Sequence, residues 1–136
     1  MGGEIIEHIM MVDDEDDYHL ITRLMLKKAG FSGRLTTFLS ADDAFSHLHG
    51  TSERPDLLLV DINMPGTNGF EFLENCERDG LLPSKGTTVI MCSSSNRPLD
   101  MDTANKLASV NGYVEKALSV EEFERIEHDH GRRMRA

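Results

Sequence analysis

The sequence is short of positive charge, of cysteine and of long apolar runs, and each shortage excludes a class of function. Its 14 Lys and Arg stand against 24 Asp and Glu, a formal net charge of −10, which argues against a nucleic-acid partner because nucleic-acid phosphates require a basic surface. No apolar run approaches the roughly 18–20 residues of a membrane-spanning helix, and the first residues lack the basic flank and apolar stretch of a signal peptide. The 2 cysteines form no Cys-x-x-Cys pair, which indicates neither a zinc site nor a disulfide framework.

The remaining composition is typical of one soluble globular domain. Hydrophobic residues make up 39% and charged residues 28% of the 136 residues, which is enough for one core and too short for two ordinary domains. We therefore predict a single domain over residues 1–130 and a short, basic, frayed C-terminal tail over residues 131–136. We also predict a cytoplasmic protein without membrane association.

Short apolar runs alternate with amphipathic stretches along the chain. The runs of strand length are residues 5–12, 34–39, 56–61, 87–92 and 112–116. Helical spacing marks the first of the intervening stretches, which closes at Gly30 and whose apolar residues are Leu20, Ile21, Leu24 and Met25. Because strands and helices alternate strictly, we predict an α/β fold with a five-stranded parallel sheet and helices on both of its faces.

Three local signals support this assignment. Ser40 is suited to cap the N-terminus of the second helix, which Gly50 ends. Ser119 and Glu122 fit a capping box at the start of the last helix. The run over residues 57–60 is apolar without alternation, which is typical of a central strand covered on both faces.

Polar side chains stand at the C-terminal ends of four of the predicted strands: Asp13 and Asp14, Asp61, Ser93 and Lys116. The C-terminal ends of parallel strands meet at one edge of the sheet, where such folds bind their ligands. Carboxylates together suit a hard divalent cation such as Mg²⁺, and the ammonium and hydroxyl groups suit a phosphoryl group beside it. A carboxylate can also be the nucleophile, giving an aspartyl phosphate.

The chain resembles the receiver domain of two-component response regulators, close in size to the stand-alone, chemotaxis-type members. The resemblance lies in the stretches MMVDDE, LLLVDINMPGTNGFEFL, VIMCSS and GYVEK, which occur in the family's order and spacing. It implies a doubly wound (βα)5, flavodoxin-like fold with strand order 2-1-3-4-5.

The resemblance also implies a role for each strand-end residue. Asp61 would be the phosphoacceptor. The implied metal site for Mg²⁺ or Mn²⁺ consists of Asp14 and Asp61 as direct ligands, the backbone carbonyl of Asn63, and Asp13 acting through a bound water.

The remaining implied positions contact the phosphoryl group or respond to it. Ser93 and Lys116 would contact the phosphoryl oxygens, and Tyr113 would be the aromatic residue whose rotamer reports the contact made by Ser93. Within SSSN we select Ser93 because it directly follows the apolar strand. Pro65 and Gly69 would shape the loop after the acceptor.

One position departs from the family pattern. The family usually follows the lysine with a proline whose preceding bond is cis, and this sequence has Ala117. A cis bond before a non-proline residue costs roughly 2.5–4 kcal/mol, against about 0.5–1 kcal/mol before proline. We therefore predict a trans Lys116–Ala117 bond with altered switching rates.

Several charged residues have a simpler interpretation. Glu15, Asp16 and Asp17 favour the positive end of the following helix and are interpreted as its solvated start. His47 and His49, like His128 and His130, are i,i+2 pairs that do not share a helix face, so we interpret them as surface residues.

We predict a signalling protein and not an enzyme. A sensor histidine kinase or a phosphotransfer protein would phosphorylate Asp61, and a downstream protein would bind the surface formed by residues 98–126. Two alternatives stay open. One is a pseudo-receiver that binds partners without phosphorylation. The other, less favoured, is an aspartyl-nucleophile phosphohydrolase; enzymes of the haloacid dehalogenase type need an acid at the position where this chain has Asn63. The sequence does not name the kinase, the target or the pathway, and it leaves open a homodimer. It also does not fix the lifetime of the phosphorylated state, although Asn63 and Ser95 are expected near the approach of hydrolytic water.

Overall fold

The structure is a computed structural model that describes residues 6–94 and 98–135. Strands and helices alternate along these residues as the sequence predicts. The elements are β1 (His8–Val12), α1 (Asp16–Lys28), β2 (Arg34–Phe38), α2 (Ala41–His49), β3 (Leu57–Asp61), α3 (Gly69–Arg78), β4 (Thr88–Ser93), α4 (Pro98–Asn105), β5 (Gly112–Glu115) and α5 (Val120–Arg135). Within the described part of the chain, no helix is both long and apolar enough to span a bilayer.

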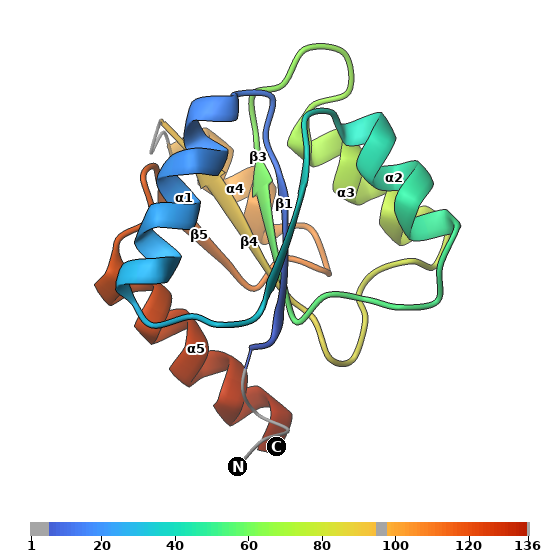
Figure 1. Ribbon diagram of the computed structural model, residues 1–136. Coiled ribbons are helices and arrows are strands. Elements are labelled where there is room, and N and C mark those ends of the chain that lie inside the picture. Colours follow the sequence, from blue (N-terminus) through green and yellow to red (C-terminus); the bar gives the residue numbers. More distant parts are fainter. Residues whose placement is uncertain (1–5, 95–97, 136) are drawn as a thin grey trace.

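The five strands form one parallel sheet in the order β2-β1-β3-β4-β5. Helices α1 and α5 cover one face of the sheet, and α2 and α3 cover the other (Figure 1). Both the parallel sheet and its strand order confirm the prediction. The C-terminal ends of β1, β3, β4 and β5 therefore lie at one edge, because every strand runs in the same direction.

Strand alternation divides the core into two layers. Met10, Val12 and Leu58 point toward α2, α3 and α4, where they join a cluster that includes Phe72. The alternate residues of the same strands point toward α1 and α5, where they pack with Phe123. All residues of β3 are buried, as expected for a central strand covered on both faces.

The predicted caps are present. Ser40 Oγ accepts a hydrogen bond from the Asp43 N–H at 3.1 Å, which satisfies one free donor at the start of α2. Ser119 and Glu122 form the reciprocal capping box of α5, with Ser119 N–H donating to Glu122 Oε1 and Glu122 N–H donating to Ser119 Oγ. These bonds fix where both helices begin.

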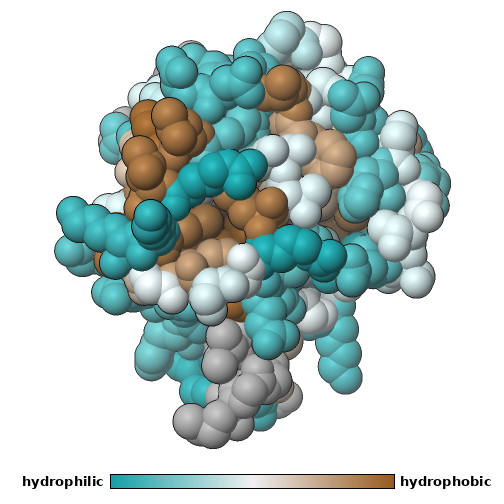
Figure 2. All heavy atoms as spheres, viewed as in Figure 1, coloured by the Kyte–Doolittle hydropathy of each residue, from teal (hydrophilic) through white to brown (hydrophobic). Residues whose placement is uncertain are grey.

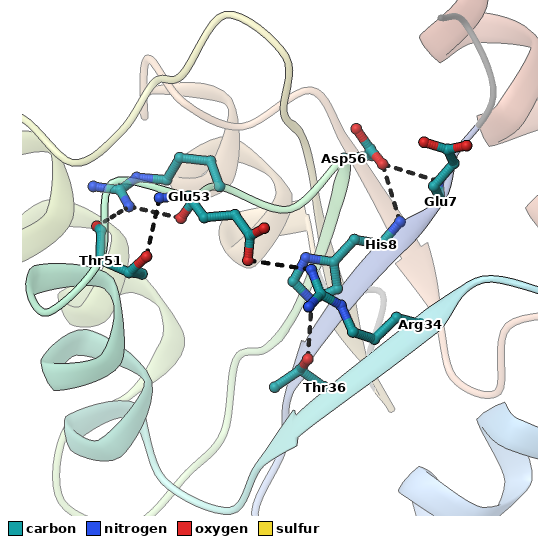
Figure 3. A network of polar contacts seen from close by, with 8 residues as sticks. Glu7, His8, Arg34, Thr36, Thr51, Glu53 and Asp56 are labelled. Carbon is teal, nitrogen blue, oxygen red and sulfur yellow. Dashed lines mark hydrogen bonds and ion pairs between the residues drawn. The ribbon is translucent and has the colours of Figure 1, made fainter. Parts of the chain in front are cut away.

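A polar network joins the first three strands at their N-terminal ends, the edge opposite the predicted site (Figure 3). The Asp56 carboxylate accepts hydrogen bonds from the backbone N–H groups of Glu7 and His8 at 2.9 and 3.0 Å. His8 Nε2 lies 2.9 Å from Thr36 Oγ1 on β2. These contacts support the register of the strands at their N-terminal ends, away from the predicted site.

Helix α1 turns a different face to the core than its apolar spacing suggests. Its buried residues are His19, Thr22, Met25 and Leu26, whereas Leu20, Ile21 and Leu24 are 57%, 42% and 60% exposed. Figure 2 shows the resulting hydrophobic patch over α1. Of the four apolar residues at helical spacing, only Met25 is therefore buried. Apolar spacing identifies a stripe on a helix, but the contacts with β1 and α5 decide which stripe is buried.

Helix α5 continues through the residues that we expected to fray. It runs to Arg135, and the Arg133 guanidinium donates hydrogen bonds to Thr88 Oγ1 at 2.7 Å and to the Thr87 carbonyl at 3.1 Å. The prediction of a frayed tail was wrong over residues 131–135, because these bonds attach the last turns to the start of β4.

The same turns bury a histidine that the spacing placed on the surface. His130 is 1% exposed, and its Nδ1 lies 2.8 Å from Thr88 Oγ1. Burial lowers its pKa from the ordinary value. The surface interpretation of His130 was therefore wrong.

Candidate functional site

The site begins at the turn from β1 to α1, where Asp13 is held by its main chain and its side chain. Its N–H donates to the Phe38 carbonyl at 3.0 Å, and its own carbonyl accepts a hydrogen bond from His19 Nε2 at 2.8 Å. Its Oδ1 accepts from the Glu15 N–H at 2.9 Å. Asp13 is therefore a fixed carboxylate, 1% exposed, at the C-terminal end of the strand.

Lys116 brings the ends of β1, β3 and β5 together. Its Nζ lies 2.8 Å from Asp13 Oδ2 and 3.1 Å from Asp61 Oδ1, and its side chain is 6% exposed. The Lys116 N–H also donates to the Ser93 carbonyl at 2.8 Å, which ties the end of β5 to the end of β4. The structure thus gathers Asp13, Asp61 and Lys116 in one buried cluster.

Burial and like charge disfavour the ionised form of Asp61. Its pKa is raised from 3.8 to about 6, first by burial and then by the neighbouring Asp13 charge, while Lys116 opposes this rise. For Lys116, burial alone would lower the pKa, but its hydrogen bond to Asp13 and the charge of Asp61 raise the pKa above the ordinary value. The cluster therefore holds a charged lysine beside carboxylates that repel each other.

The bond that follows Lys116 is cis, as is the Leu82–Pro83 bond. The prediction of a trans Lys116–Ala117 bond was wrong. That prediction considered only the local preference of a non-proline bond. The surroundings of Lys116, including its contacts with Asp13 and Asp61, come from distant parts of the chain and did not enter it.

Carboxylates suited to a divalent cation continue from this cluster along the chain after Asp13. Asp13, Asp14 and Glu15 offer oxygens that all lie within 4.8 Å of one another, and an all-oxygen donor set is the kind that Mg²⁺ prefers. Glu15 was assigned to the helix start, yet its Oε1 lies 3.8 Å from Lys116 Nζ, so the sequence interpretation missed its place at the rim of the site. The available signal was its position directly after the acidic pair.

The loop after Asp61 folds back closely onto the main chain of Asp61. The Gly69 N–H donates to the Ile62 carbonyl at 2.9 Å, and a Cβ atom at Gly69 would lie 2.2 Å from the Asp61 carbonyl oxygen. Any side chain there would collide with the main chain of Asp61. Asn63 lies in the same loop and is exposed, and Asn68 and Glu71 form the capping box that starts α3.

The remaining predicted residues occupy the neighbouring strands. Ser93 ends β4 and is fully buried. Tyr113 lies opposite Met91 in the register of β4 and β5 and is half-buried. Ser95 lies outside the described residues.

The fold and the site together indicate the class of protein to which the chain belongs. A doubly wound parallel sheet places acids from two neighbouring strands and a lysine from a third at its C-terminal edge, an arrangement for binding a cation and a phosphoryl group. The sequence model of the family described as response regulator receiver domain matches residues 9–126. The chain belongs to this family of two-component signalling proteins.

The similar proteins agree with this assignment. The chain is 26% identical over 133 residues to the probable methanogenesis regulatory protein FilR2 of Methanothrix harundinacea, covering 91% of this chain and 84% of that protein. It is 26% identical over 131 residues to the two-component response regulator ORR1 of Oryza sativa subsp. japonica, covering 92% of this chain and 55% of ORR1. The chain also spans 37% of the transcriptional regulatory protein AfsQ1 of Streptomyces coelicolor and matches it over 68% of its own length at 28% identity.

Solved structures share the fold. A two component response regulator from Cytophaga hutchinsonii superposes with a TM-score of 0.83 at 24% identity, covering 93% of this chain and 97% of that one. A CheY-like receiver domain protein from Methanospirillum hungatei superposes with a TM-score of 0.76 at 20% identity, covering 96% and 98%. Receiver domains are phosphorylated by histidine kinases, signal to downstream targets and generally bind Mg²⁺.

Proposed function

We propose that this receiver accepts a phosphoryl group on Asp61 from a sensor histidine kinase or a phosphotransfer protein. The observation that carries the proposal is the position of Asp61. It ends the buried central strand, is 4% exposed, and has the Lys116 ammonium 3.1 Å from its Oδ1. A fixed ammonium beside the attacking oxygen can stabilise the charge that develops on a transferred phosphoryl group.

We propose that Asp14 and Asp61 bind Mg²⁺ or Mn²⁺ directly, together with the backbone carbonyl of Asn63, and that Asp13 acts through a water molecule. The engagement of Asp13 supports this division, because its Oδ1 accepts from the Glu15 N–H and its Oδ2 pairs with Lys116. When bound, the cation would neutralise the carboxylates and orient the phosphoryl oxygens.

In the same proposal, Lys116 and Ser93 contact the phosphoryl oxygens, and Tyr113 responds to the contact made by Ser93. The surface of residues 98–126 would then bind a downstream protein. We propose that this receiver acts in the cytoplasm and catalyses only its own phosphorylation and dephosphorylation. A switch of this kind works only when the two states bind the partner with different affinity.

The phosphorylation experiment uses Mg²⁺ and acetyl phosphate, with intact-mass measurement of the protein. Wild type should gain the mass of one phosphoryl group, and Asp61→Asn should not. Asp56→Asn is the matched control, because the same chemical change then falls at the opposite end of the strand that carries Asp61. Beryllofluoride with a fluorescence or NMR readout provides a second measurement without turnover.

The outcomes separate the alternatives. The proposal is supported if wild type and Asp56→Asn are labelled and Asp61→Asn is not. Absence of labelling and of any beryllofluoride response in wild type would favour the pseudo-receiver. Steady turnover of small phosphomonoesters would favour the phosphohydrolase.

A further inference from the structure

An aromatic ring completes the surroundings of the Lys116 ammonium. The centroid of the Tyr18 ring lies 4.1 Å from Lys116 Nζ, on the same group that contacts Asp13 at 2.8 Å and Asp61 at 3.1 Å. This distance is well inside the range of about 6 Å within which a ring face attracts a cation. The ammonium therefore has an aromatic neighbour as well as its carboxylates.

The position of Tyr18 is fixed by the start of α1. Its N–H donates to the Glu15 carbonyl at 3.1 Å, and its side chain packs, partly buried, against the core layer beneath α1 and α5. The segment that supplies Asp13 and Asp14 thus also supplies the Tyr18 ring. Asp13 and the ring therefore approach Lys116 from the same part of the chain.

We propose that Tyr18 is a positioning residue for phosphoryl transfer, which holds the Lys116 ammonium beside Asp61 through a cation–π contact. The inference rests on the proposed function, because it assigns a task to Tyr18 in the phosphorylation of Asp61. It concerns a residue that none of the sequence signals identified.

The chemistry of the ring suits this task better than a further acid would. Lysine is a flexible side chain that loses substantial rotamer entropy when it is held in one place. A further carboxylate could hold it, but would add negative charge that repels an incoming phosphoryl group. The ring attracts the ammonium through its quadrupole and carries no net charge. Tyr18 can therefore restrain Lys116 without opposing the substrate.

The step to be measured is transfer from acetyl phosphate in the presence of Mg²⁺. An Asp61 carboxylate oxygen attacks phosphorus and forms a new P–O bond. The bond from phosphorus to the acetyl oxygen breaks, and acetate leaves with the electron pair. A small donor is chosen because it has no docking surface, so that the rate reports the site alone.

Ring variants separate positioning from packing. Tyr18→Phe keeps the ring face and should keep the wild-type rate, whereas Tyr18→Leu removes the face and should slow labelling about 2- to 30-fold. Phe45→Leu is the matched control, because it removes a half-buried ring from α2 that packs on His49 with centroids 4.7 Å apart. Phe45→Leu should label at the wild-type rate, and Mg²⁺ binding should be similar in all of these proteins.

Two further measurements test the contact itself. Replacing Tyr18 by phenylalanine with one, two or three ring fluorines keeps the shape but weakens the attraction for a cation step by step, so the labelling rate should fall with each fluorine. In the metal-free protein, the Lys116 methylene protons should show a ring-current shift in wild type and Tyr18→Phe that Tyr18→Leu lacks. This NMR readout does not depend on phosphorylation.

The failures are distinguishable. If wild type is labelled and folded Tyr18→Leu is labelled at the same rate, or if fluorination leaves the rate unchanged, the positioning role is overturned and the proposed function stands. If wild type is not labelled, the proposed function fails and the role of Tyr18 fails with it. If Tyr18→Leu does not fold, the fluorinated series decides.

Discussion

Replacing the proposed acceptor, Asp61→Asn, should make the metal-free protein more stable at neutral pH. Asp61 is 4% exposed and lies near Asp13, so its ionised form is unfavourable in the folded state. Asparagine has nearly the same shape, carries no charge and leaves Lys116 paired with Asp13 at 2.8 Å. The variant therefore removes a repulsion without removing the lysine's nearest partner.

The direction in which pH changes the free energy of unfolding follows from proton linkage at Asp61. The pKa of Asp61 rises from 3.8 to about 6 on folding, so the folded protein binds more protons than the unfolded chain between these values, and stability falls as the pH rises through them. Above pH 6 the full penalty applies, and a rise of about two units corresponds to about 3 kcal/mol. At pH 4.5 the same values leave a penalty of about 1 kcal/mol.

Urea unfolding in EDTA at pH 7.5 and at pH 4.5 measures the effect. The gain in free energy of unfolding for Asp61→Asn should be as much as about 3 kcal/mol at the higher pH and smaller by about 2 kcal/mol at the lower pH. Mg²⁺ should stabilise wild type more than the variant, because the variant lacks one of the proposed ligands.

Asp56→Asn provides the control, since the same substitution should have the opposite effect there. The Asp56 carboxylate accepts hydrogen bonds from two backbone N–H groups, and an amide oxygen accepts them less strongly, so this variant should lose about 1 kcal/mol. Asp61 does not destabilise the folded protein in this way if Asp61→Asn is neutral or destabilising at pH 7.5 in EDTA, or if the gain in stability does not shrink on acidification.

Three further predictions concern other parts of the molecule. Gly69→Ala should destabilise the protein by about 1–3 kcal/mol and slow labelling by acetyl phosphate, whereas Gly86→Ala, where an added Cβ meets nothing within 4 Å, should leave unfolding and labelling unchanged. Burial lowers the pKa of His130 below 6.5, so the unfolded chain binds the proton at a higher pH than the folded protein does. Wild type should therefore lose stability as the pH falls through 6.5. Thermal unfolding should show a smaller loss for His130→Gln, and an equal loss would contradict this. Burial raises the pKa of Cys76 and Cys92 to about 12, so both thiols should resist a maleimide in the native protein and react in urea, and rapid native labelling would argue against this packing.

Local signals in the sequence were sufficient for the order of the elements and for the core of the site. The apolar run of β3 and the strict alternation identify a parallel sheet, because few other arrangements bury such a strand. Once the sheet is parallel, the residues that come directly after its strands must gather at its C-terminal edge. This is why Asp13, Asp61 and Lys116 could be placed together, and the structure joins them through one ammonium group.

Other features depend on which surfaces meet. Helical spacing found the apolar residues of α1, yet Leu20 and Leu24 face outward, because the orientation of a helix is set by its neighbours. The last turns of α5 are polar in sequence, and the bonds of Arg133 to Thr87 and Thr88 that attach them to the start of β4 depend on the tertiary structure.

The acidic segment after β1 shows most clearly which features the sequence determines and which depend on the tertiary structure. Together with Asp61 and Lys116 at the ends of other strands, its charges and its place after an apolar strand predict a cation site that includes Asp13 and Asp14. That the ring of Tyr18 lies over Lys116 could not be read from the same residues. Neighbours along the chain determine caps and strands, whereas contacts between α1 and the end of β5 exist only after the sheet has brought segments some hundred residues apart within a few ångströms.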